Sequence, residues 1–169
     1  MKKWEIFQRA AADYERWYTT TRRGRRADTA ERALLQSLLG HVPAARTILE
    51  VGAGTGHFCG SMADSGFGIV GLDRAPAMLQ QARRIFPSIP FVLGDAHRLP
   101  FRTEAVDVVV FITALEFLEN AGAALREAVR VARRGLVALS STDTAWAASH
   151  AALVPIRAGR FSHRRGIIR

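Results

Sequence analysis

Hydrophobic residues recur along this chain at two spacings, and the two spacings predict different elements of structure. Across residues 4–18 apolar side chains return every three or four positions, which predicts a helix. Residues 28–40 repeat this spacing, and Asp28 with Glu31 three positions later resembles a capping box that starts a second helix. The basic residues 22–26 interrupt the pattern between these two helices.

Short apolar runs bounded by glycine, proline or acidic residues predict the strands. They span residues 46–51, 68–73, 91–95, 106–111 and 136–140. Helices are predicted from the glycine-rich turn after the first strand to Ser65 and Gly66, from Pro76 to about Phe86, and over residues 121–134. This alternation predicts the α/β class, with a doubly wound, Rossmann-like, mostly parallel sheet and helices on both faces.

The predicted elements form a single domain, because 169 residues suffice for one core and no low-complexity linker divides them. Residues 1–45 supply the N-terminal helices and residues 46–140 the alternating strands and helices. In the C-terminal segment, residues 141–169, a helix with Asp143 as its cap is predicted over residues 142–153, and no strand pair follows it.

Composition narrows the class of protein without changing the predicted fold. Hydrophobic residues make up 49% of the chain and charged residues 23%, which is typical of a globular protein. No apolar run approaches the roughly 20 residues of a membrane span, and the N-terminus lacks the long apolar stretch of a secretory signal. Cys59 is the only cysteine, so we expect a buried thiol, no intrachain disulfide and a reducing, cytoplasmic location.

Arginine carries almost all of the positive charge in a chain whose net charge at pH 7 is +9. The arginines cluster at residues 22–26, 133–134 and 164–165. Such clusters can attract nucleic acid or an anionic membrane surface, but they lack the interleaved aromatic residues on which single-strand binders stack bases. We therefore prefer a solvated basic surface to a nucleic-acid site.

The stretch over residues 47–58 carries the strongest chemical signal. Its apolar strand runs into Gly52, Gly54 and Gly56, which predicts a tight turn where a ligand lies against bare backbone at the start of a helix. A dinucleotide fingerprint has its third glycine one position later, where this chain has His57. The spacing therefore indicates a different ligand.

Four predicted strands end at or near a residue suited to a binding site: Glu50, Asp73, Asp95 and Phe111. Because the carboxyl ends of parallel strands lie at one edge of a sheet, we expect these side chains to converge on one crevice at the switch point. The convergence of separate strands is a stronger indication of a site than any single motif.

Several sequence blocks, in this order, resemble the motifs of class I S-adenosylmethionine (SAM)-dependent methyltransferases. They are residues 47–58, 71–79, 94–101, and 107–111 with 115–118. The resemblance covers roughly residues 10–140 and is closest to the small-molecule branch, which includes quinone-biosynthesis-type methyltransferases. It implies SAM as the cofactor and a small molecule as the methyl acceptor.

Each part of SAM can be matched to a residue at one of the strand ends. The glycine turn suits the methionine carboxylate, and Glu50 suits the ammonium group. Asp73 suits the ribose diol, and Asp95 with Ala96 suits adenine. Tyr14 and Trp17 resemble the aromatic residues of a lid. The predicted cofactor-binding residues are Tyr14, Trp17, Glu50, Gly52, Ala53, Gly54, Thr55, Gly56, Asp73, Arg74, Met78, Asp95, Ala96 and Phe111.

Several of these residues also have a purely structural interpretation. Asp73 can cap the helix that follows it, and Asp95 can be a turn residue. Tyr14 and Trp17 can pack within a helix. Asp107 is expected to serve at the start of its strand rather than to bind a ligand.

Methyl transfer from SAM depends on orientation and desolvation more than on a catalytic side chain. A general base is required only for a poor nucleophile such as a phenol or a hydroxyl group. We therefore assign no catalytic residue. The candidates for a base are Glu116, Asp143, His150, His57 and His97, with packing or surface roles preferred for the histidines. No histidine and cysteine cluster has zinc-ligand spacing, so no metal is predicted.

Two rival functions stay open. The arginine clusters suit an RNA or protein methyltransferase, but residues 113–116 are Thr-Ala-Leu-Glu, where enzymes that methylate planar amino groups are expected to carry Asn/Asp-Pro-Pro-aromatic. The family's sheet normally has seven strands, the last two antiparallel, and the sequence predicts a sheet without strands six and seven. Such a chain would bind SAM without turnover, or would cover its open sheet edge with a partner or with a second copy in a homodimer.

Overall fold

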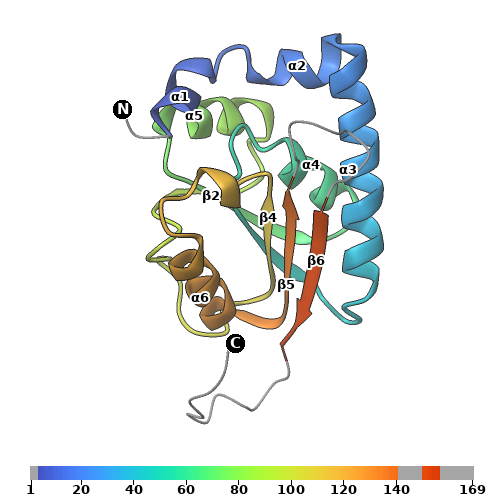
Figure 1. Cartoon of the computed structure of the whole chain (residues 1–169), viewed down its shortest axis with the longest axis vertical. Coiled ribbons are helices and arrows are strands. Elements are labelled where there is room, and N and C mark those ends of the chain that lie inside the picture. The colour runs from blue at the N-terminus through green and yellow to red at the C-terminus, as the bar shows by residue number, and fades with distance from the viewer. Residues whose placement is uncertain (1–3, 141–149, 157–169) are drawn as a thin grey trace.

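A six-stranded sheet forms the centre of the fold in a computed structural model that describes residues 4–140 and 150–156 (Figure 1). The strands are β1 (Thr47–Val51), β2 (Gly68–Asp73), β3 (Phe91–Leu93), β4 (Val106–Ile112), β5 (Ala132–Ser140) and β6 (His150–Pro155), in the order β3-β2-β1-β4-β5-β6. Neighbouring strands from β3 to β5 are parallel, and β6 is antiparallel to β5. The predicted α/β fold with a mostly parallel sheet is confirmed.

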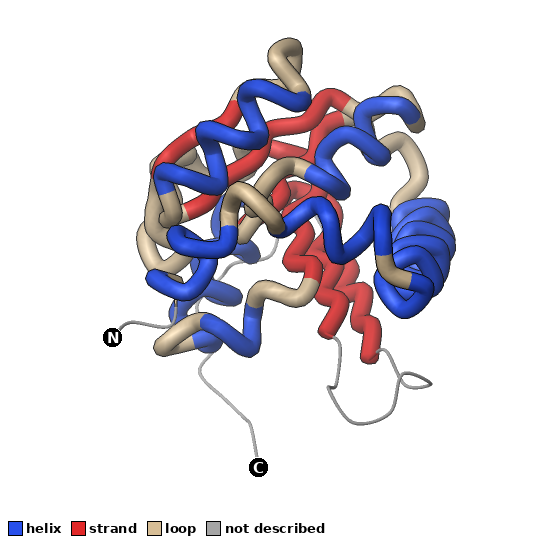
Figure 2. Tube along the Cα trace, turned by 90° about the horizontal axis from the view of Figure 1, so that it is seen from above, coloured by secondary structure: helices blue, strands red, loops and turns tan. Residues whose placement is uncertain are grey.

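Helices cover both faces of this sheet, as Figure 2 shows. The described helices are α1 (Glu5–Ala10), α2 (Tyr14–Thr20), α3 (Arg22–Gly40), α4 (His57–Asp64), α5 (Pro76–Ile85) and α6 (Ala121–Val131), with a 3-10 turn, η1, at Leu115–Phe117. None of the helices in the described ranges is both long and apolar enough to span a bilayer.

Alternate residues of the central strands face the two helical layers. On β1, Ile48 belongs to the cluster with Leu35 of α3 and Phe58 of α4, whereas Leu49 belongs to the cluster with Ala128 of α6. Burial on both faces explains why β1 and β4 are continuous apolar runs. β1 lies between β2 and β4. The chain passes from β1 to β2 and β3 on one side, and then crosses from β3 to β4 on the other side, so the strand order reverses at β1. A crevice opens at this point, beyond the carboxyl end of β1.

Asp107 joins the amino-terminal ends of the strands, in the structural role that the sequence suggested. Its carboxylate accepts the backbone N–H groups of Arg46 at 2.9 Å and Thr47 at 3.0 Å. The guanidinium groups of Arg133 and Arg134 lie 3.2 Å from the same carboxylate. These two arginines belong to β5 and not, as predicted, to the preceding helix, so part of the basic charge is paired internally.

The helix predicted over residues 4–18 is two helices, because the chain turns between α1 and α2. Ala11 is buried in a cluster with Ala75 and Met78, and the N–H of Asp13 donates to the carbonyl of Ala10 at 3.0 Å. The turn lets α1 pack against α5 while α2 packs against α3. A continuous helix would not make both contacts.

Helix α3 begins at Arg22, before the predicted start at Asp28. Its N-cap is Thr21, whose hydroxyl accepts the N–H of Gly24 at 2.8 Å. A Cβ at Gly24 would lie 2.0 Å from the carbonyl oxygen of Trp17, so glycine permits the close approach of α2 and α3. The basic residues 22–26 are therefore the first turns of the helix, and the predicted capping box is wrong.

Residues 150–153, which the sequence predicted as helix, belong to β6 instead. Without β6 the outer edge of β5 would present unpaired backbone groups; β6 pairs with it from His150 opposite Ser140 to Pro155 opposite Gly135. A sixth strand is thus present, and the expectation that the sheet ends at the fifth strand is wrong. The rest of the predicted helix, with Asp143, lies outside the described residues.

Candidate functional site

A cleft opens at the carboxyl ends of β1, β2 and β4, and together with the open solvent at its entrance it encloses about 870 Å³. Its walls include Asp73 at the end of β2, residues 94–97 after β3, and Phe111 near the end of β4. Three of the four predicted strand-end residues therefore meet here, and Glu50 is not among the lining residues. The other lining residues are Trp4, Phe7, Tyr14, Val51, Gly52, Gly54, Leu72, Arg74, Met78, Ile112, Thr113, Ala114, Phe117, Leu118 and Glu119.

The glycine turn takes backbone conformations that other residues avoid. Gly52 and Gly54 have φ angles of +81° and +55°. A Cβ at Gly52 would lie 2.6 Å from the Cβ of Ala114, whereas the same position at Gly54 is open. The N–H groups of Gly52 and Ala53 donate to the carbonyl of Leu72 at 2.8 and 3.0 Å. The turn is thus fastened to β2, and bare backbone at Gly54 borders the cleft.

Asp73 connects the glycine turn to the start of α5. Its Oδ2 accepts the N–H of Gly54 and its Oδ1 accepts the N–H of Ala75, both at 2.8 Å. Ala75 is the N-cap residue of α5, so Asp73 has a role at this helix start, as the structural interpretation suggested. Burial raises the pKa of Asp73, and the N–H bonds offset that effect only in part. The carboxylate has about four acceptor sites, so these N–H groups leave it acceptor capacity for a ligand.

Asp95 forms a turn with His97 at the opposite wall. Its Oδ1 accepts the backbone N–H of His97 at 2.9 Å and lies 2.6 Å from the ring Nδ1, while the N–H of Asn120 donates to Nε2 at 3.3 Å. These partners hold the ring with Nδ1 toward Asp95 and Nε2 toward the backbone N–H of Asn120. Burial alone would raise the pKa of Asp95, but the bonds from His97 and the charge of Arg74, 3.7 Å away, lower it. His97 therefore braces this loop and is not a free base.

Glu50 lies within the core next to α4. Its side chain is buried and accepts a hydrogen bond from the Cys59 thiol at 2.9 Å. Burial raises the pKa of Glu50 to about 8 and raises that of Cys59 as well. The arrangement pairs Glu50 with a thiol and gives it no exposed oxygen at the cleft wall.

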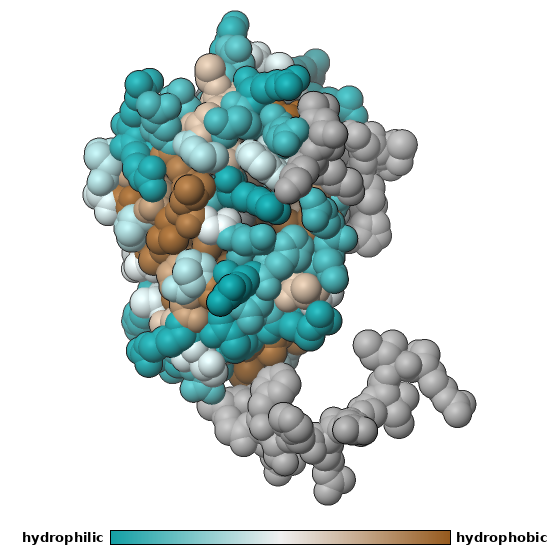
Figure 3. Space-filling view, turned by 90° about the vertical axis from the view of Figure 1, so that its left-hand side faces the viewer, coloured by the Kyte–Doolittle hydropathy of each residue, from teal (hydrophilic) through white to brown (hydrophobic). Residues whose placement is uncertain are grey.

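Aromatic side chains from α1, α2 and η1 cover the cleft. Tyr14 lines it as predicted, whereas Trp17 is 44% exposed and does not line it. Sequence reasoning missed Phe7 and Phe117, whose ring centroids lie 4.8 Å apart across the cleft mouth, and Trp4. The helical spacing of Trp4 and Phe7 was the available signal. The face seen in Figure 3 carries an apolar region bordered by hydrophilic residues.

Thr113 also lines the cleft and was not predicted from the sequence. It follows β4 with a φ of +47°, which is an outlier for a β-branched residue, and its N–H donates to the carbonyl of Leu139 at 2.8 Å. Strained backbone of this kind clusters at functional sites, and Thr113 lines the cleft.

The remaining predicted residues lie elsewhere or have other partners. Ala53, Thr55 and Gly56 are not lining residues, and the Thr55 hydroxyl donates to Glu15. Both ring nitrogens of His57 face carboxylates. Within the described ranges, no group of three or more histidine, cysteine or acidic side chains is arranged to hold a metal ion.

Comparison with known proteins identifies related sequences and folds. The methyltransferase domain family matches residues 49–139, more than half of the chain. A demethylmenaquinone methyltransferase of Renibacterium salmoninarum is 38% identical over 104 residues, which cover 62% of this chain and 44% of that protein. A malonyl-[acyl-carrier protein] O-methyltransferase of Yersinia pestis is 34% identical over 136 residues, or 80% and 48% of the two chains.

A solved structure gives the same picture of the fold. A SAM-dependent methyltransferase from Thermotoga maritima superposes with a TM-score of 0.66 and 28% identity, over 81% of this chain and 60% of the other. The chain spans about half the length of the curated relatives that it matches.

Proposed function

We propose, from the premise that the chain belongs to the class I SAM-dependent methyltransferases, that it binds SAM in this cleft and transfers a methyl group to a small molecule. The observation that carries the proposal is the meeting of Asp73, Asp95 and open backbone at Gly54 in one cleft covered by aromatic rings. SAM supplies a methyl group activated by a sulfonium, which the acceptor takes by in-line displacement.

The lining residues fit the chemistry of SAM. Asp73 has acceptor capacity left for the ribose diol beyond its backbone N–H partners. Asp95 provides an acceptor for the adenine amine, and Met78 and Ala96 are apolar lining residues for its ring faces. We propose as cofactor contacts those predicted residues that line the cleft, namely Tyr14, Gly52, Gly54, Asp73, Arg74, Met78, Asp95, Ala96 and Phe111.

The acceptor that we propose is a small molecule with a planar apolar part. Trp4, Phe7 and Phe117 supply aromatic surface at the cleft mouth. Among the described lining residues Arg74 alone carries a full positive charge, and it faces Asp95 and the ring of Trp4, 5.6 Å from its centroid. An acceptor of the quinol type, as the name of the Renibacterium relative suggests, therefore suits the cleft better than a carboxylate.

The residues of this chain would act by orientation and by exclusion of water. The edge-to-face contact between Phe7 and Phe117 narrows the mouth, and the glycine turn fixes one wall. Both ring nitrogens of His97 are engaged by Asp95 and Asn120, so we assign it no proton transfer. An acceptor that ionises readily needs no base from the protein.

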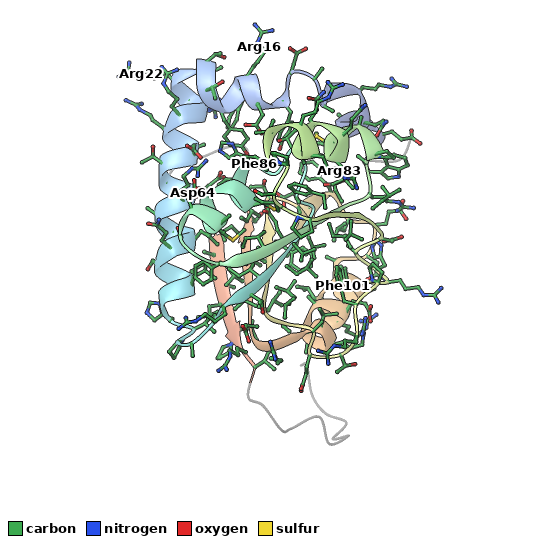
Figure 4. The ribbon with its side chains drawn as sticks, turned by 180° about the vertical axis from the view of Figure 1, so that it is seen from behind. Arg16, Arg22, Asp64, Arg83, Phe86 and Phe101 are labelled. Atoms are coloured by element: carbon green, nitrogen blue, oxygen red, sulfur yellow. The ribbon has the colours of Figure 1, made fainter. Side chains whose placement is uncertain are left out.

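Calorimetry with SAM and with its demethylated product tests cofactor binding. Asp73→Ala should weaken SAM binding by roughly 1–3 kcal/mol, because buried acceptors for the ligand are lost. The matched control is Asp64→Ala, at an exposed aspartate near the end of α4 (Figure 4). Equal affinity of the Asp73→Ala and wild-type proteins would remove Asp73 from the site, and absence of SAM binding to the folded wild type would refute the proposal.

Turnover needs a separate assay with labelled SAM and a panel of phenols, quinols, carboxylates and amines. Labelled product from a quinol or phenol supports the proposed acceptor. Tight SAM binding without a product across the panel would favour the rival function, SAM binding without turnover.

RNA is the second candidate acceptor, because the arginines of α2 and α3 are exposed. Arg16 and Arg22 project from the corner between these helices (Figure 4). Arg133 and Arg134 are instead paired with Asp107, which leaves a smaller basic surface than the sequence suggests. Salt-dependent RNA binding would support this candidate, and its absence would dispose of it.

Two further proposals concern where the protein is located and whether it forms a dimer. We propose a cytoplasmic location, which the single buried thiol at Cys59 supports. We also propose that a second copy pairs at the outer edge of β6, which the described residues leave unpaired. Light scattering of the purified chain distinguishes a dimer from a monomer.

A further inference from the structure

His57 occupies an unusual position between three parts of the chain. It is the first residue of α4, directly after the glycine turn, and its side chain is only 13% exposed. Its Nδ1 lies 2.9 Å from Oε2 of Glu15 on α2, and its Nε2 lies 2.7 Å from Oδ1 of Asp28 on α3. Only a protonated imidazole donates from both nitrogens, so these distances describe an imidazolium between two carboxylates.

Arg32 completes this arrangement from α3. Its Nε lies 2.5 Å from Oδ1 of Asp28, and its Nη2 lies 3.0 Å from Nε2 of His57. The shorter distance from Nε2 to Asp28 favours the proton on that nitrogen. When His57 loses this proton, Nε2 becomes an acceptor and Arg32 is its remaining donor. The bond to Asp28 is then lost, and the bond from Nδ1 to Glu15 of α2 loses its charge assistance.

The same contacts position the wall of the cleft. Glu15 also accepts the hydroxyl of Thr55 in the glycine turn, so α2 is bonded to the turn at two points. The ring of Tyr18 stacks on His57 with centroids 4.2 Å apart, and Tyr14, next to Glu15, lines the cleft. A change at His57 therefore reaches the aromatic wall through α2.

The groups around His57 are predominantly acidic. Glu31 of α3 is buried, its Oε2 has no hydrogen-bond partner among the described residues, and burial raises its pKa to about 7. Burial alone would lower the pKa of His57, but the bonds to Glu15 and Asp28 outweigh it and raise the pKa. The titratable and charged groups that face His57 are Glu15 and Tyr18 of α2, Asp28, Glu31 and Arg32 of α3, and Glu50 of β1.

We propose that His57 is a positioning residue whose imidazolium holds the N-terminal helices against the glycine turn, and that alkaline pH opens this contact and weakens SAM binding. We call Glu15, Asp28, Arg32 and His57 the His57 latch. The effect on SAM rests on the proposed function, whereas the effect on the helices does not.

The direction of the pH dependence follows from the pKa shifts. Because the pKa of His57 is raised, the latch is complete below the ordinary histidine value of 6.5 and is lost as pH rises through the folded-state value. Burial would raise the pKa values of Glu15 and Asp28, but the bonds from His57 outweigh it and lower both, so acid opens the latch only below their ordinary range.

Hydrogen exchange of the free protein tests the latch directly. Between pH 6 and pH 9, protection of amides 5–20, corrected for the intrinsic rate, should fall by about tenfold in the wild type, because a charge-assisted bond is lost. In His57→Gln it should change less than threefold. His41→Gln, at an exposed histidine after α3, is the matched control and should behave as the wild type.

Glu15→Gln, which replaces the carboxylate facing His57, provides a second test if His57→Gln does not fold. It keeps the shape of the side chain and removes the charge, so its protection should also be nearly independent of pH. Asp13→Asn, in an exposed ion pair on the same segment, is its control. An unchanged wild-type profile, or an equal fall in the latch variants and the controls, overturns the proposal.

Calorimetry at the two pH values adds the functional result. The wild type should bind SAM about tenfold more weakly at pH 9 than at pH 6, and His57→Gln should lose most of this dependence. A wild type that binds SAM equally at both values overturns the coupling. A wild type that binds no SAM at either value refutes the proposed function, while hydrogen exchange still decides whether the latch exists.

Discussion

Two aspartates, Asp107 buried and Asp73 half-buried, lie at opposite ends of the parallel sheet and differ in how far their hydrogen-bonding capacity is used. Asp107, at the amino-terminal end of β4, accepts two backbone N–H groups and the hydroxyl of Thr47, and faces two arginines. Burial alone would raise its pKa, but these partners lower it to about 2. Asp73, at the carboxyl end of β2, accepts N–H groups from neighbouring turns, and burial raises its pKa.

The difference separates a structural carboxylate from one that is available to a ligand. Asp107 has a side chain that is 7% exposed and donors on several sides, so it holds β1, β4 and β5 together. Asp73 borders an open cleft with spare acceptor capacity and an ionised form that its surroundings stabilise poorly. A ligand that donates hydrogen bonds to Asp73 would supply the missing stabilisation.

Removal of the Asp107 carboxylate, which has donors on several sides, should have the largest effect on stability. Asp107→Ala should lower the free energy of unfolding by about 3 kcal/mol, because buried N–H groups of Arg46 and Thr47 lose their acceptor and two arginines lose their counter-ion. Urea denaturation measures this change. Asp64→Ala, at an exposed position, should change stability by less than about 0.5 kcal/mol. If Asp107→Ala is as stable as this control, the structural role assigned to Asp107 is wrong.

Protonation of Asp107 in acid should lower the free energy of unfolding by slightly less than its replacement with alanine does. Because the pKa of Asp107 is about 2, below its ordinary value of 3.8, its contribution is present above 3.8 and is lost as pH falls through about 2. The stability gap between the wild type and Asp107→Asn should therefore narrow by about 2 kcal/mol between pH 5 and pH 2. Urea titrations at each pH measure it, and a constant gap would contradict the assigned pKa.

The parts of the fold that the sequence predicted well are those determined by local pattern. The apolar run of β2 and the proline at the start of α5 define their elements within a few residues, and the observed bounds of β2 equal the predicted ones. The helix break at residues 11–13 and the strand β6 depend instead on which surfaces are available for packing. A periodic pattern contains no information on a partner strand that lies elsewhere in the chain.

The site shows the same division. Gly54, Asp73 and Asp95 stand at strand ends and could be placed at the cleft from parallel topology. The capping box proposed for Asp28 was wrong because α3 already begins at Arg22, and the Asp28 carboxylate bonds Arg32 and His57, which is 29 positions away. Glu50 was predicted to bind the ammonium group of the cofactor, and in the fold its carboxylate is buried and accepts the thiol of Cys59. Side-chain direction at these positions depends on contacts between distant segments.

Among substitutions of the two compared aspartates, Asp73→Asn is expected to change stability least, and it tests whether Asp73 is available to a ligand. The neutral amide removes an ionised group that burial disfavours, but it replaces one acceptor oxygen with a donor that faces the N–H of Gly54 or of Ala75. Because these effects oppose each other, the free energy of unfolding at pH 7 should differ from the wild type by less than about 1 kcal/mol, as measured in urea. SAM affinity should fall by more than that in the same protein. If Asp73→Asn instead unfolds as easily as Asp107→Ala and binds SAM normally, both aspartates are structural and the cleft has no specific acceptor for the ribose.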